Sequence, residues 1–483
     1  MKKHDIGLIG LAVMGQNLVL NMSDHGFSVA VYNRTFAKTQ EFIRDRAAGR
    51  DIVGAESLHE LVTHLERPRR VMLMIKSGQP VDLTIEALLP LLDAGDVIID
   101  GGNSFFQATI RRHRYLAEKG IHYIGAGVSG GEIGARRGPS IMPGGAQPAW
   151  ETVRPILQGI AAKVDGDVPC CDWMGTDGAG HYVKMVHNGI EYGFMQLIAE
   201  SYAVMKHILQ LSYPKMASVF KEWDQGKLNS YLVEITADIL AYRDADGSPL
   251  VGNILDAAGQ KGTGRWTSES ALLLGIPLTL ISEAVFARAL SALKEERLQA
   301  APFFDAPEAE EIKDKGSLQT DLGNALYLAE IISYAQGFML FREAAAEYNW
   351  SLNYASIANI WRDGCIIRSA LLKHIRDAFS HDPDLKNLLL APFFQQVAME
   401  NIASLRRVVT AAVNAGVPVP ALSSALAFFD GYRAGVLPAN LIQAQRDFFG
   451  SHTYERIDKP RGEFFHTNWT GEGGDVTAST YTA

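Results

Sequence analysis

The first fifteen residues constrain the fold more than any other part of the chain. They read MKKHDIGLIGLAVMG, in which an apolar run ends at Gly10 and four residues lead on to Gly15. The run predicts a short buried strand, and Gly10 can adopt the backbone angles of a tight turn. Ala12 is small enough for another group to approach the backbone, and Gly15 permits close packing of a following helix. A strand, a turn and a helix in this order predict the first βαβ unit of a parallel sheet.

The same start resembles a secretory signal, because lysines precede the apolar run. Asp5 interrupts that run and glycines punctuate it, so we interpret it as a strand and a turn. Up to about residue 175, more short apolar segments alternate with amphipathic stretches, which is typical of an α/β fold. The strands expected in this region are SVAVYN, RRVMLMI, DVIID and IHYIGAG.

After Gly178 the strand signals stop, and long segments with a 3.6-residue period continue to about residue 435. The fold class expected is an α/β Rossmann-type dinucleotide-binding domain followed by a large all-α domain and an extended C-terminal tail. The boundaries we expect are 1–177, 178–435 and 436–483.

A faint internal repeat crosses the helical part. GFMQLIAESY from Gly193 recurs as GFMLFREAAAEY from Gly337, and WDQG from Trp223 recurs as WRDG from Trp361. The spacing is too long for a solenoid, so duplication of a helical bundle and chance similarity both stay open. The tail is polar and aromatic and lacks helical periodicity, which predicts either disorder or docking onto a partner subunit.

Composition excludes several classes of protein. The 483 residues are 47% hydrophobic and 20% charged, with a formal net charge of −9, so a direct nucleic-acid partner is not expected. Three cysteines form no disulfide framework and have no metal-ligand spacing, which predicts a reducing compartment and no metal site. No apolar stretch is long enough to span a membrane. We therefore expect a cytoplasmic protein without a membrane partner.

The turn after the first strand predicts a dinucleotide site, with phosphates at the N-terminus of the next helix. At the end of SVAVYNRT, a protein that binds NAD would normally place an acidic residue on the ribose hydroxyl. Here Asn33, Arg34 and Thr35 stand instead. An arginine can pair with a 2′-phosphate, which favours NADP, although a solvent-facing turn arginine is the alternative.

Other strand ends supply further candidates, because ligands lie at the carboxyl ends of parallel strands. MIKSG places Lys76 there, and DGGNSFF places Asn103 there, both near the expected nicotinamide. The residues that we expect to bind the cofactor are Gly10, Leu11, Ala12, Val13, Met14, Gly15, Asn33, Arg34, Thr35, Ile75, Lys76, Ser77 and Asn103.

The stretch VKMVHNGIEYG gathers chemistry on one face of a predicted helix. At 100° per residue, Lys184, His187, Asn188 and Glu191 form a single stripe opposite an apolar side. A solvated helix face is the simpler interpretation. Glycines within the same stretch lower helix stability and argue for a packing or functional reason instead.

Several motifs now follow one another in order: the Gly10–Gly15 turn, the Asn33–Thr35 turn, GVSGGEIGARRGPSIMPGG, GAGHYVKMVHNGIEYG, KGTGRWT and LIQAQRDFFGSHTYERID. Together they closely resemble the decarboxylating 6-phosphogluconate dehydrogenases over essentially the whole length. The first motifs are shared with the wider β-hydroxyacid dehydrogenase group, whereas the last two are more specific. The resemblance implies oxidation of 6-phosphogluconate by NADP in the pentose phosphate pathway, with loss of carbon dioxide and release of ribulose 5-phosphate.

The resemblance also implies roles for matching residues. Lys184 is expected to act as general base and later acid, and Glu191 as the acid that protonates carbon 1. His187 and Asn188 are expected to assist them. The expected substrate contacts are Asn103, Ser129, Gly130, Gly131, His187, Asn188, Tyr192, Lys261, Arg288, Arg446 and His452. The resemblance further implies a homodimer, with Arg446 and His452 donated from one subunit's tail to the other's site.

Two other functions remain open on the sequence alone. A β-hydroxyacid dehydrogenase for an unphosphorylated substrate would not need the cations Lys261, Arg288 and Arg446. A nonenzymatic NADP-binding sensor or scaffold would keep the glycine turn, yet it would have no reason to keep Lys184 and Glu191 together.

Overall fold

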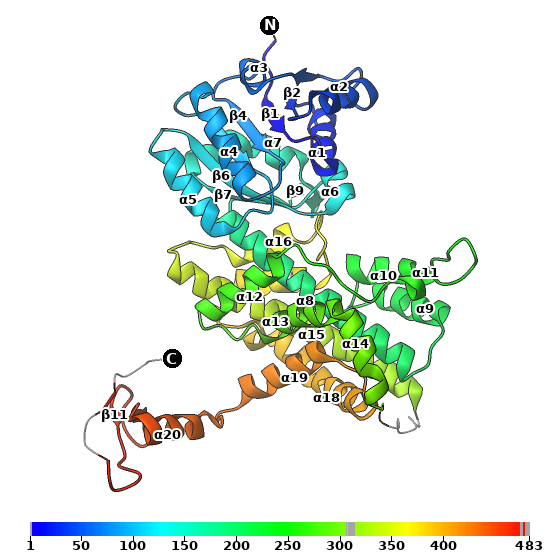
Figure 1. Cartoon of the computed structure of the whole chain (residues 1–483), viewed down its shortest axis with the longest axis vertical. Helices are drawn as coiled ribbons and strands as arrows, with labels where there is room; N and C mark the ends of the chain where they lie inside the picture. The colour runs from blue at the N-terminus through cyan, green and yellow to red at the C-terminus, as the bar shows by residue number, and fades with distance from the viewer. Residues whose placement is uncertain (1, 306, 308–313, 474–476, 479–483) are drawn as a thin grey trace. The chain divides into compact units, whose positions relative to one another are not determined.

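The computed structural model describes residues 2–305, 307, 314–473 and 477–478. The chain divides into two compact units, Met1–Leu426 and Ala427–Ala483, and we describe each unit separately. The first unit contains a seven-stranded sheet and a large helical region, which confirms the predicted fold class. Figure 1 shows the sheet in blue and cyan with helices on both of its faces.

The sheet has the order β3-β2-β1-β4-β5-β6-β7, in which all neighbouring pairs are parallel except β6 with β7. Its strands are β1 Ile6–Ile9, β2 Val29–Tyr32, β3 Ile52–Ala55, β4 Arg70–Leu73, β5 Val97–Asp100, β6 His122–Val128 and β7 Ile141–Gly145. The sequence pattern missed β3 and β7; the signal of β7 is weak because it contains a proline and two glycines. The helices around the sheet are α1 Val13–Asp24, α2 Phe36–Asp45, α3 Leu58–Thr63, α4 Gln79–Leu88, α5 Phe106–Ala117, α6 Gly131–Arg137 and α7 Gln147–Ile160. A short 3-10 turn, η1 Leu89–Leu91, and a small hairpin, β8 Lys163–Val164 with β9 Val168–Pro169, complete this region.

The register of the sheet decides where loops meet. Ile9 pairs with Leu73, and Leu73 pairs with Asp100. The chain therefore leaves β1, β4 and β5 at the same edge, and the loops that follow these strands begin side by side. Alternate side chains of the strands enter two apolar clusters, one on each face of the sheet. Burial on both faces explains why the strands are continuous apolar runs.

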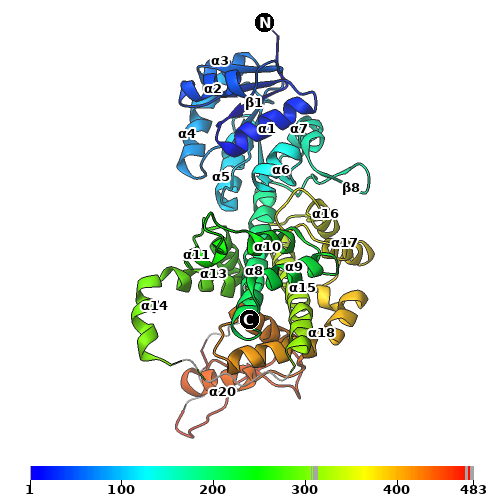
Figure 2. The ribbon, with the colours of Figure 1, turned by 90° about the vertical axis from the view of Figure 1, so that its right-hand side faces the viewer.

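Two long helices form the centre of the helical region. These are α8 Ala179–His207 and α15 Lys315–Glu347, which pack against each other (Figure 2). Glycine permits their close approach, because a Cβ added at Gly193 would lie 2.7 Å from Ser333 Oγ and one at Gly337 would lie 2.7 Å from Ile190 Cδ1. The predicted helix over 183–193 is confirmed, and its glycines have a packing reason.

The other helices of this region surround that pair. They are α9 Tyr213–Asp224, α10 Tyr231–Ala241, α11 Leu250–Asn253, α12 Thr263–Leu273, α13 Thr279–Ala292, α14 Lys294–Ala300, α16 Tyr354–Ile360, α17 Leu371–His381, α18 Pro392–Asn414 and α19 Pro420–Arg433, with 3-10 turns η2 Ala301–Phe303 and η3 Leu388–Leu390. In both copies of the faint repeat the GFM segment lies on a long helix, and the tryptophan lies at or just beyond the end of a shorter one. None of the described helices is both long and apolar enough to cross a membrane.

The second unit contains α20 Ala439–Gly450 and a small hairpin of β10 Tyr454–Glu455 with β11 Phe464–Phe465. The sequence analysis ended helical periodicity at about residue 435 and did not predict α20. Asp447 organises this unit, since its buried carboxylate accepts hydrogen bonds from the amides of Thr453 and Thr467 and from Trp469 Nε1. The side chain of Asp447, near the end of α20, thus ties the helix to residues that follow it in sequence. Helical periodicity does not report such tertiary contacts.

One buried carboxyl in α15 predicts a dependence of stability on pH. Glu330 is 1% exposed, and within the described part of the chain its Oε1 has no hydrogen-bond partner. Burial raises the pKa of Glu330 to about 8 from an ordinary value of 4.5. Because the folded-state pKa is the higher one, this group's contribution to stability is full below the ordinary pKa and is lost as the pH rises through 8.

We expect Glu330→Gln to unfold at a temperature a few degrees higher than the wild type at about pH 9, and at nearly the same temperature at about pH 4, below the ordinary pKa of the carboxyl. Thermal unfolding followed by circular dichroism at both pH values measures this difference. Glu347→Gln, at the exposed end of the same helix, is the control. An equal shift at both pH values would show that ionisation of Glu330 is not the cause.

Candidate active site

The turn between β1 and α1 is shaped by its glycines. Gly10 has a φ of +105°, and a Cβ added there would lie 2.4 Å from the carbonyl oxygen of Met74. A Cβ at Gly15 would lie 1.9 Å from the carbonyl oxygen of Gly10. No side chain caps the N-terminus of α1, where Ala12 is the N-cap residue. The amides at this helix end are thus left to bind an anion, as a dinucleotide phosphate requires.

The Asn33–Thr35 turn lies directly beside the glycine turn. Asn33 Oδ1 accepts a hydrogen bond of 3.1 Å from the amide of Leu11, and Asn33 Nδ2 donates one of 3.2 Å to the carbonyl oxygen of Thr35. Asn33 therefore joins the two turns. Arg34 is exposed and makes no hydrogen bond or ion pair among the residues described, so its guanidinium is available to a ligand. This environment fits a 2′-phosphate.

The loops after β4 and β5 adjoin each other at the same edge of the sheet. A Cβ added at Gly102 would lie 3.2 Å from the carbonyl oxygen of Ile75. Lys76 and Asn103 are both exposed on these loops, and Ser77 is half-buried. Lys76 and Asn103 thus lie on neighbouring loops at the carboxyl ends of their strands, where the sequence analysis expected them.

The polar stripe of α8 is buried, so its interpretation as a solvated face is wrong. His187 is fully buried, Lys184 is 6% exposed, and the side chain of Glu191 is 21% exposed. Lys184 can pack this closely because β6 has a glycine opposite it. A Cβ at Gly127 would lie 2.3 Å from Lys184 Cβ. The lysine therefore lies against the backbone of the sheet rather than in water.

A chain of polar contacts joins the stripe to its neighbours. Lys184 Nζ lies 3.3 Å from His187 Nδ1. His187 Nδ1 also lies 3.1 Å from Asn188 Oδ1. Asn188 Nδ2 donates to Thr263 Oγ1 at 3.1 Å, and His187 Nε2 lies 3.2 Å from Ser129 Oγ. A proton on Nδ1 satisfies this set, because Asn188 then accepts from Nδ1 and Nε2 accepts from Ser129. Nδ1–H also faces Lys184 Nζ, which favours a neutral amine with a free lone pair.

Burial shifts the ionisation of the whole stripe. Loss of solvent lowers the pKa of Lys184, although nearby Glu191 opposes this. Burial and the charge of Lys184 lower the pKa of His187 well below its ordinary value. Burial raises the pKa of Glu191, against the effect of Lys184 and Arg288. A lysine with a lowered pKa and a carboxyl with a raised pKa form a base and an acid two helical turns apart.

Two further predicted contacts meet at the next turn of α8. The guanidinium carbon of Arg288 lies 3.6 Å from the centre of the Tyr192 ring, over its face. Tyr192 packs against the start of α12, where a Cβ at Gly264 would lie 2.5 Å from the ring. Lys261 is exposed on the loop just before α12. A tyrosine and two nearby cations are suited to an anionic group such as a phosphate.

The Ser129–Gly131 turn is held by a distant loop. Gly130 has a φ of +97°, and a Cβ added there would lie 2.4 Å from the carbonyl oxygen of Gly364. That same oxygen accepts a hydrogen bond of 2.7 Å from the amide of Ser140. The turn is therefore fixed between the sheet and the WRDG segment of the faint repeat.

The two residues predicted in the tail belong to the other unit. Arg446 Nη1 donates to Gln443 Oε1 at 2.8 Å, one turn earlier on α20. His452 lies between Ser451 and Thr453, which both have a φ of +51°. Asp447 fixes this turn through the amide of Thr453. Arg446 and His452 are thus held near each other by the tail's own structure.

The sequence did not identify every residue of this site. Thr263 orients Asn188, Gly127 makes room for Lys184, and the ring of Trp361 lies 5.5 Å from that of His187. Asp447 was also missed, although it directly follows Arg446. Only the repeated tryptophan had a signal, as part of the internal repeat. Among the described residues, no three His, Cys, Asp or Glu side chains gather closely enough to hold a metal ion.

Comparison with known proteins covers both halves of this arrangement. Residues 5–175 match the model for the NAD binding domain of 6-phosphogluconate dehydrogenase, and residues 180–469 match the model for its C-terminal domain. The chain is 58% identical to the decarboxylating 6-phosphogluconate dehydrogenase of Ovis aries over 485 residues, with all of both chains covered. It is 57% identical to the Homo sapiens protein of the same name, again over all of both chains.

A solved structure is similar as well. The 6-phosphogluconate dehydrogenase of Plasmodium falciparum superimposes with a TM-score of 0.93 at 46% identity, covering 96% of this chain and all of that one. That protein is described in its apo form, in complex with its cofactor NADP+ and in complex with its substrate 6-phosphogluconate.

Proposed function

The chain belongs to the family of decarboxylating 6-phosphogluconate dehydrogenases, and we propose that the buried stripe of α8 carries out the chemistry of that family here. The protein oxidises 6-phosphogluconate with NADP and releases carbon dioxide and ribulose 5-phosphate, a reaction of the pentose phosphate pathway. The predicted family, overall reaction and cofactor are confirmed. A hydroxyacid dehydrogenase for an unphosphorylated substrate and a nonenzymatic sensor are set aside.

The observation that carries the residue assignment is the buried contact of Lys184 with His187. Because burial lowers the pKa of Lys184, its neutral amine can accept the proton of the substrate's 3-hydroxyl. NADP held by the Gly10–Gly15 turn would supply the acceptor for the hydride that carbon 3 loses. The resulting β-keto acid loses carbon 1 as carbon dioxide, and protonated Lys184 returns its proton to the ketone oxygen to give an enediol. Glu191, whose pKa burial raises, then donates a proton to the enediol carbon that had carried the lost carboxylate, which becomes carbon 1 of ribulose 5-phosphate.

The remaining residues hold the two ligands. We assign the cofactor to the Gly10–Gly15 turn, the Asn33–Thr35 turn, Ile75, Lys76, Ser77 and Asn103. Ser129, Gly130 and Gly131 offer a hydroxyl and amides to the carboxylate of the sugar acid, while His187 and Asn188 orient it. Tyr192, Lys261 and Arg288 bind its phosphate. The division of the chain at 1–177, 178–435 and 436–483 and a cytoplasmic location are further parts of the proposal.

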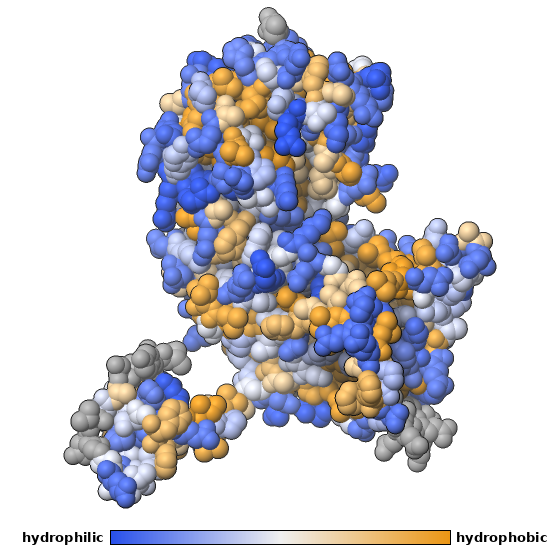
Figure 3. Space-filling view, viewed as in Figure 1, coloured by the Kyte–Doolittle hydropathy of each residue, from blue (hydrophilic) through white to orange (hydrophobic). Residues whose placement is uncertain are grey.

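A homodimer completes the site. Two residues of the proposed substrate site, Arg446 and His452, lie in the second unit. Exposed apolar residues also argue for a partner. Figure 3 shows apolar side chains gathered over α12 and α13, where Leu272, Leu273 and Phe286 are 82%, 79% and 66% exposed. Patches of this kind mark protein interfaces. We propose that each tail reaches the substrate site of the other subunit.

The first prediction concerns the base. Lys184→Met should lower kcat by roughly 10²- to 10⁴-fold, because it removes proton transfer while keeping the size of the side chain. Absorbance of reduced nicotinamide and released carbon dioxide, measured in one sample, follow both products, which the wild type forms in equal amounts. Binding of NADP, measured by calorimetry, should be unchanged. Lys206→Met, near the end of the same helix, is the control, and near-normal turnover of Lys184→Met would rule out the assigned base.

The second prediction concerns the choice of cofactor. Arg34→Ala should weaken NADP binding by about 1.5–3 kcal/mol, the usual value of a hydrogen bond to a charged group, and leave NAD binding nearly unchanged. Dissociation constants for both nucleotides measure the difference. Lys38→Ala, an exposed cation on the following helix, is the matched control. Equal losses for NADP and NAD would contradict the role of Arg34.

The third prediction tests the exchange of tails. Lys184→Met and Arg446→Met should each be nearly inactive alone. After unfolding, mixing and refolding together, random dimers should recover about a quarter of wild-type activity, because half are mixed and each mixed dimer has one intact site. If Arg446 served its own subunit, every site would carry one substitution. No recovery, with mixed dimers demonstrated by mass spectrometry, would therefore contradict the proposal.

A further inference from the structure

Two loops that we assign to the ligands share one buried anchor. The loop after β4 carries Lys76, and the loop after β5 carries Asn103. Both loops leave neighbouring strands at one edge of the sheet, with Gly102 close to the carbonyl oxygen of Ile75. Neither Lys76 nor Asn103 forms a hydrogen bond with another side chain among the described residues. Their positions must therefore be fixed through the backbone of the loops.

Arg112 of α5 reaches the first loop with one part of its guanidinium. Its Nη2 donates to the carbonyl oxygen of Gly78 at 3.0 Å and to Asp82 Oδ2 at 3.1 Å, and its Nε donates to Asp82 Oδ1 at 2.8 Å. Asp82 lies in the first turn of α4, and Gly78 is the N-cap residue of that helix. The forked contact thus fixes the end of the Lys76 loop and the start of the helix together.

The opposite side of the guanidinium reaches the second loop. Arg112 Nη1 lies 3.4 Å from both Asp100 Oδ2 and Ser104 Oγ. Asp100 in turn accepts hydrogen bonds of 2.6 Å from Ser104 Oγ and 3.1 Å from the amide of Gly102. These bonds hold the residues directly before and after Asn103, Gly102 and Ser104. A single side chain therefore connects the loop that carries Lys76 with the loop that carries Asn103.

Arg112 and Asp100 are charged side chains buried away from water, which costs free energy. Arg112 is 1% exposed, and Asp100 is fully buried. Burial alone would lower the pKa of Arg112, but Asp82, Tyr123 and Asp100 raise it, so the guanidinium stays charged. A buried ion pair is weak evidence for stability, since apolar packing often serves as well. Its value here is the geometry that its several donors impose on the two loops.

We propose that Arg112 is a positioning residue for hydride transfer, which holds the Lys76 loop and the Asn103 loop in one fixed arrangement. This inference rests on the proposed assignment of Lys76 and Asn103 to the ligands. A lysine at this position keeps the charge but lacks the planar fork, so it can serve one loop at a time. The loops then sample other positions, and the alignment of substrate and cofactor is lost.

The experiment compares neighbouring arginines that share a partner. Arg112→Lys should lower kcat roughly 10- to 100-fold, as expected for misplacement of about 1 Å. With substrate deuterated at carbon 3, it should also raise the isotope effect on kcat, because hydride transfer becomes the slow step. A merely structural loss would reduce the amount of active enzyme and leave the isotope effect unchanged.

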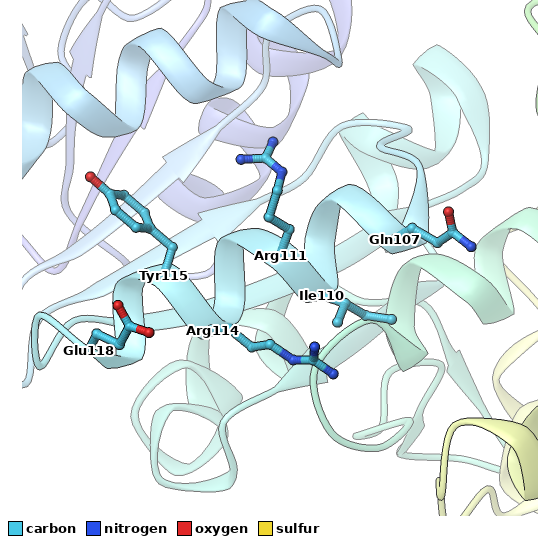
Figure 4. A pocket seen from close by; sticks show the side chains of 6 residues that line it. All are labelled: Gln107, Ile110, Arg111, Arg114, Tyr115 and Glu118. Carbon is cyan, nitrogen blue, oxygen red and sulfur yellow. The ribbon is translucent and has the colours of Figure 1, made fainter.

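Arg111→Lys is the matched control. Arg111 Nη2 also donates to Asp82 Oδ1 at 2.8 Å, but its side chain is 61% exposed and, within the described part of the chain, forms no hydrogen bond with either loop. Figure 4 shows it on the surface of α5, where it lines a shallow pocket with Arg114 and Tyr115. This variant should keep kcat within about twofold of the wild type. Wild-type kcat and isotope effect in Arg112→Lys would overturn the proposal.

Two further variants keep the outcome decisive. If Arg112→Lys does not fold, Asp82→Asn weakens the same anchor at a partly exposed position, and an unchanged isotope effect there would overturn the proposal. Lys76→Met and Asn103→Ala test the underlying assignment. If both retain normal ligand binding and turnover, that assignment fails. If they lose activity while Arg112→Lys does not, only the role of Arg112 fails.

Discussion

Burial of Lys184 against the sheet is the interaction on which the rest of the active site depends. An amine in water is protonated at neutral pH and cannot accept a proton from an alcohol. Because β6 has glycine at position 127, the side chain of Lys184 packs against the backbone and loses solvent. Burial also lowers the pKa of His187 and raises the pKa of Glu191. Burial thus shifts the pKa of each group in the direction that its proposed role needs, with Lys184 as the base and Glu191 as the acid.

The sheet and the helical region contribute different parts of this chemistry. Register places the loops after β1, β4 and β5 at one edge, where Arg112 connects two of them. The helical region supplies α8 and, through Thr263 and Gly264 of α12, the supports of Asn188 and Tyr192. Because α8 packs against β6 and β7, this one helix brings Lys184 and its neighbours to the sheet. In the proposed dimer, the second unit adds Arg446 and His452 to the partner subunit's site.

Particular residues show how far sequence reasoning reached. The glycine turn, the strands over 6–9 and 97–100 and the stripe of α8 were predicted because each has a local period or spacing. The helix over 439–450 was missed, since Asp447 stabilises it through donors up to 22 residues away. Thr263 and Arg112 were also missed, because neither belongs to a periodic pattern and each acts through a partner distant in sequence.

The sequence by itself determined the α/β and all-α halves, the dinucleotide turn and the set of residue types on one helical face. It did so because backbone periodicity and glycine spacing are local properties. Only the tertiary structure decided that this face is buried and that Lys184 has a lowered pKa. Desolvation depends on atoms brought from β6, α12 and the segment around Trp361, and no local pattern records which distant segments will exclude water from a side chain.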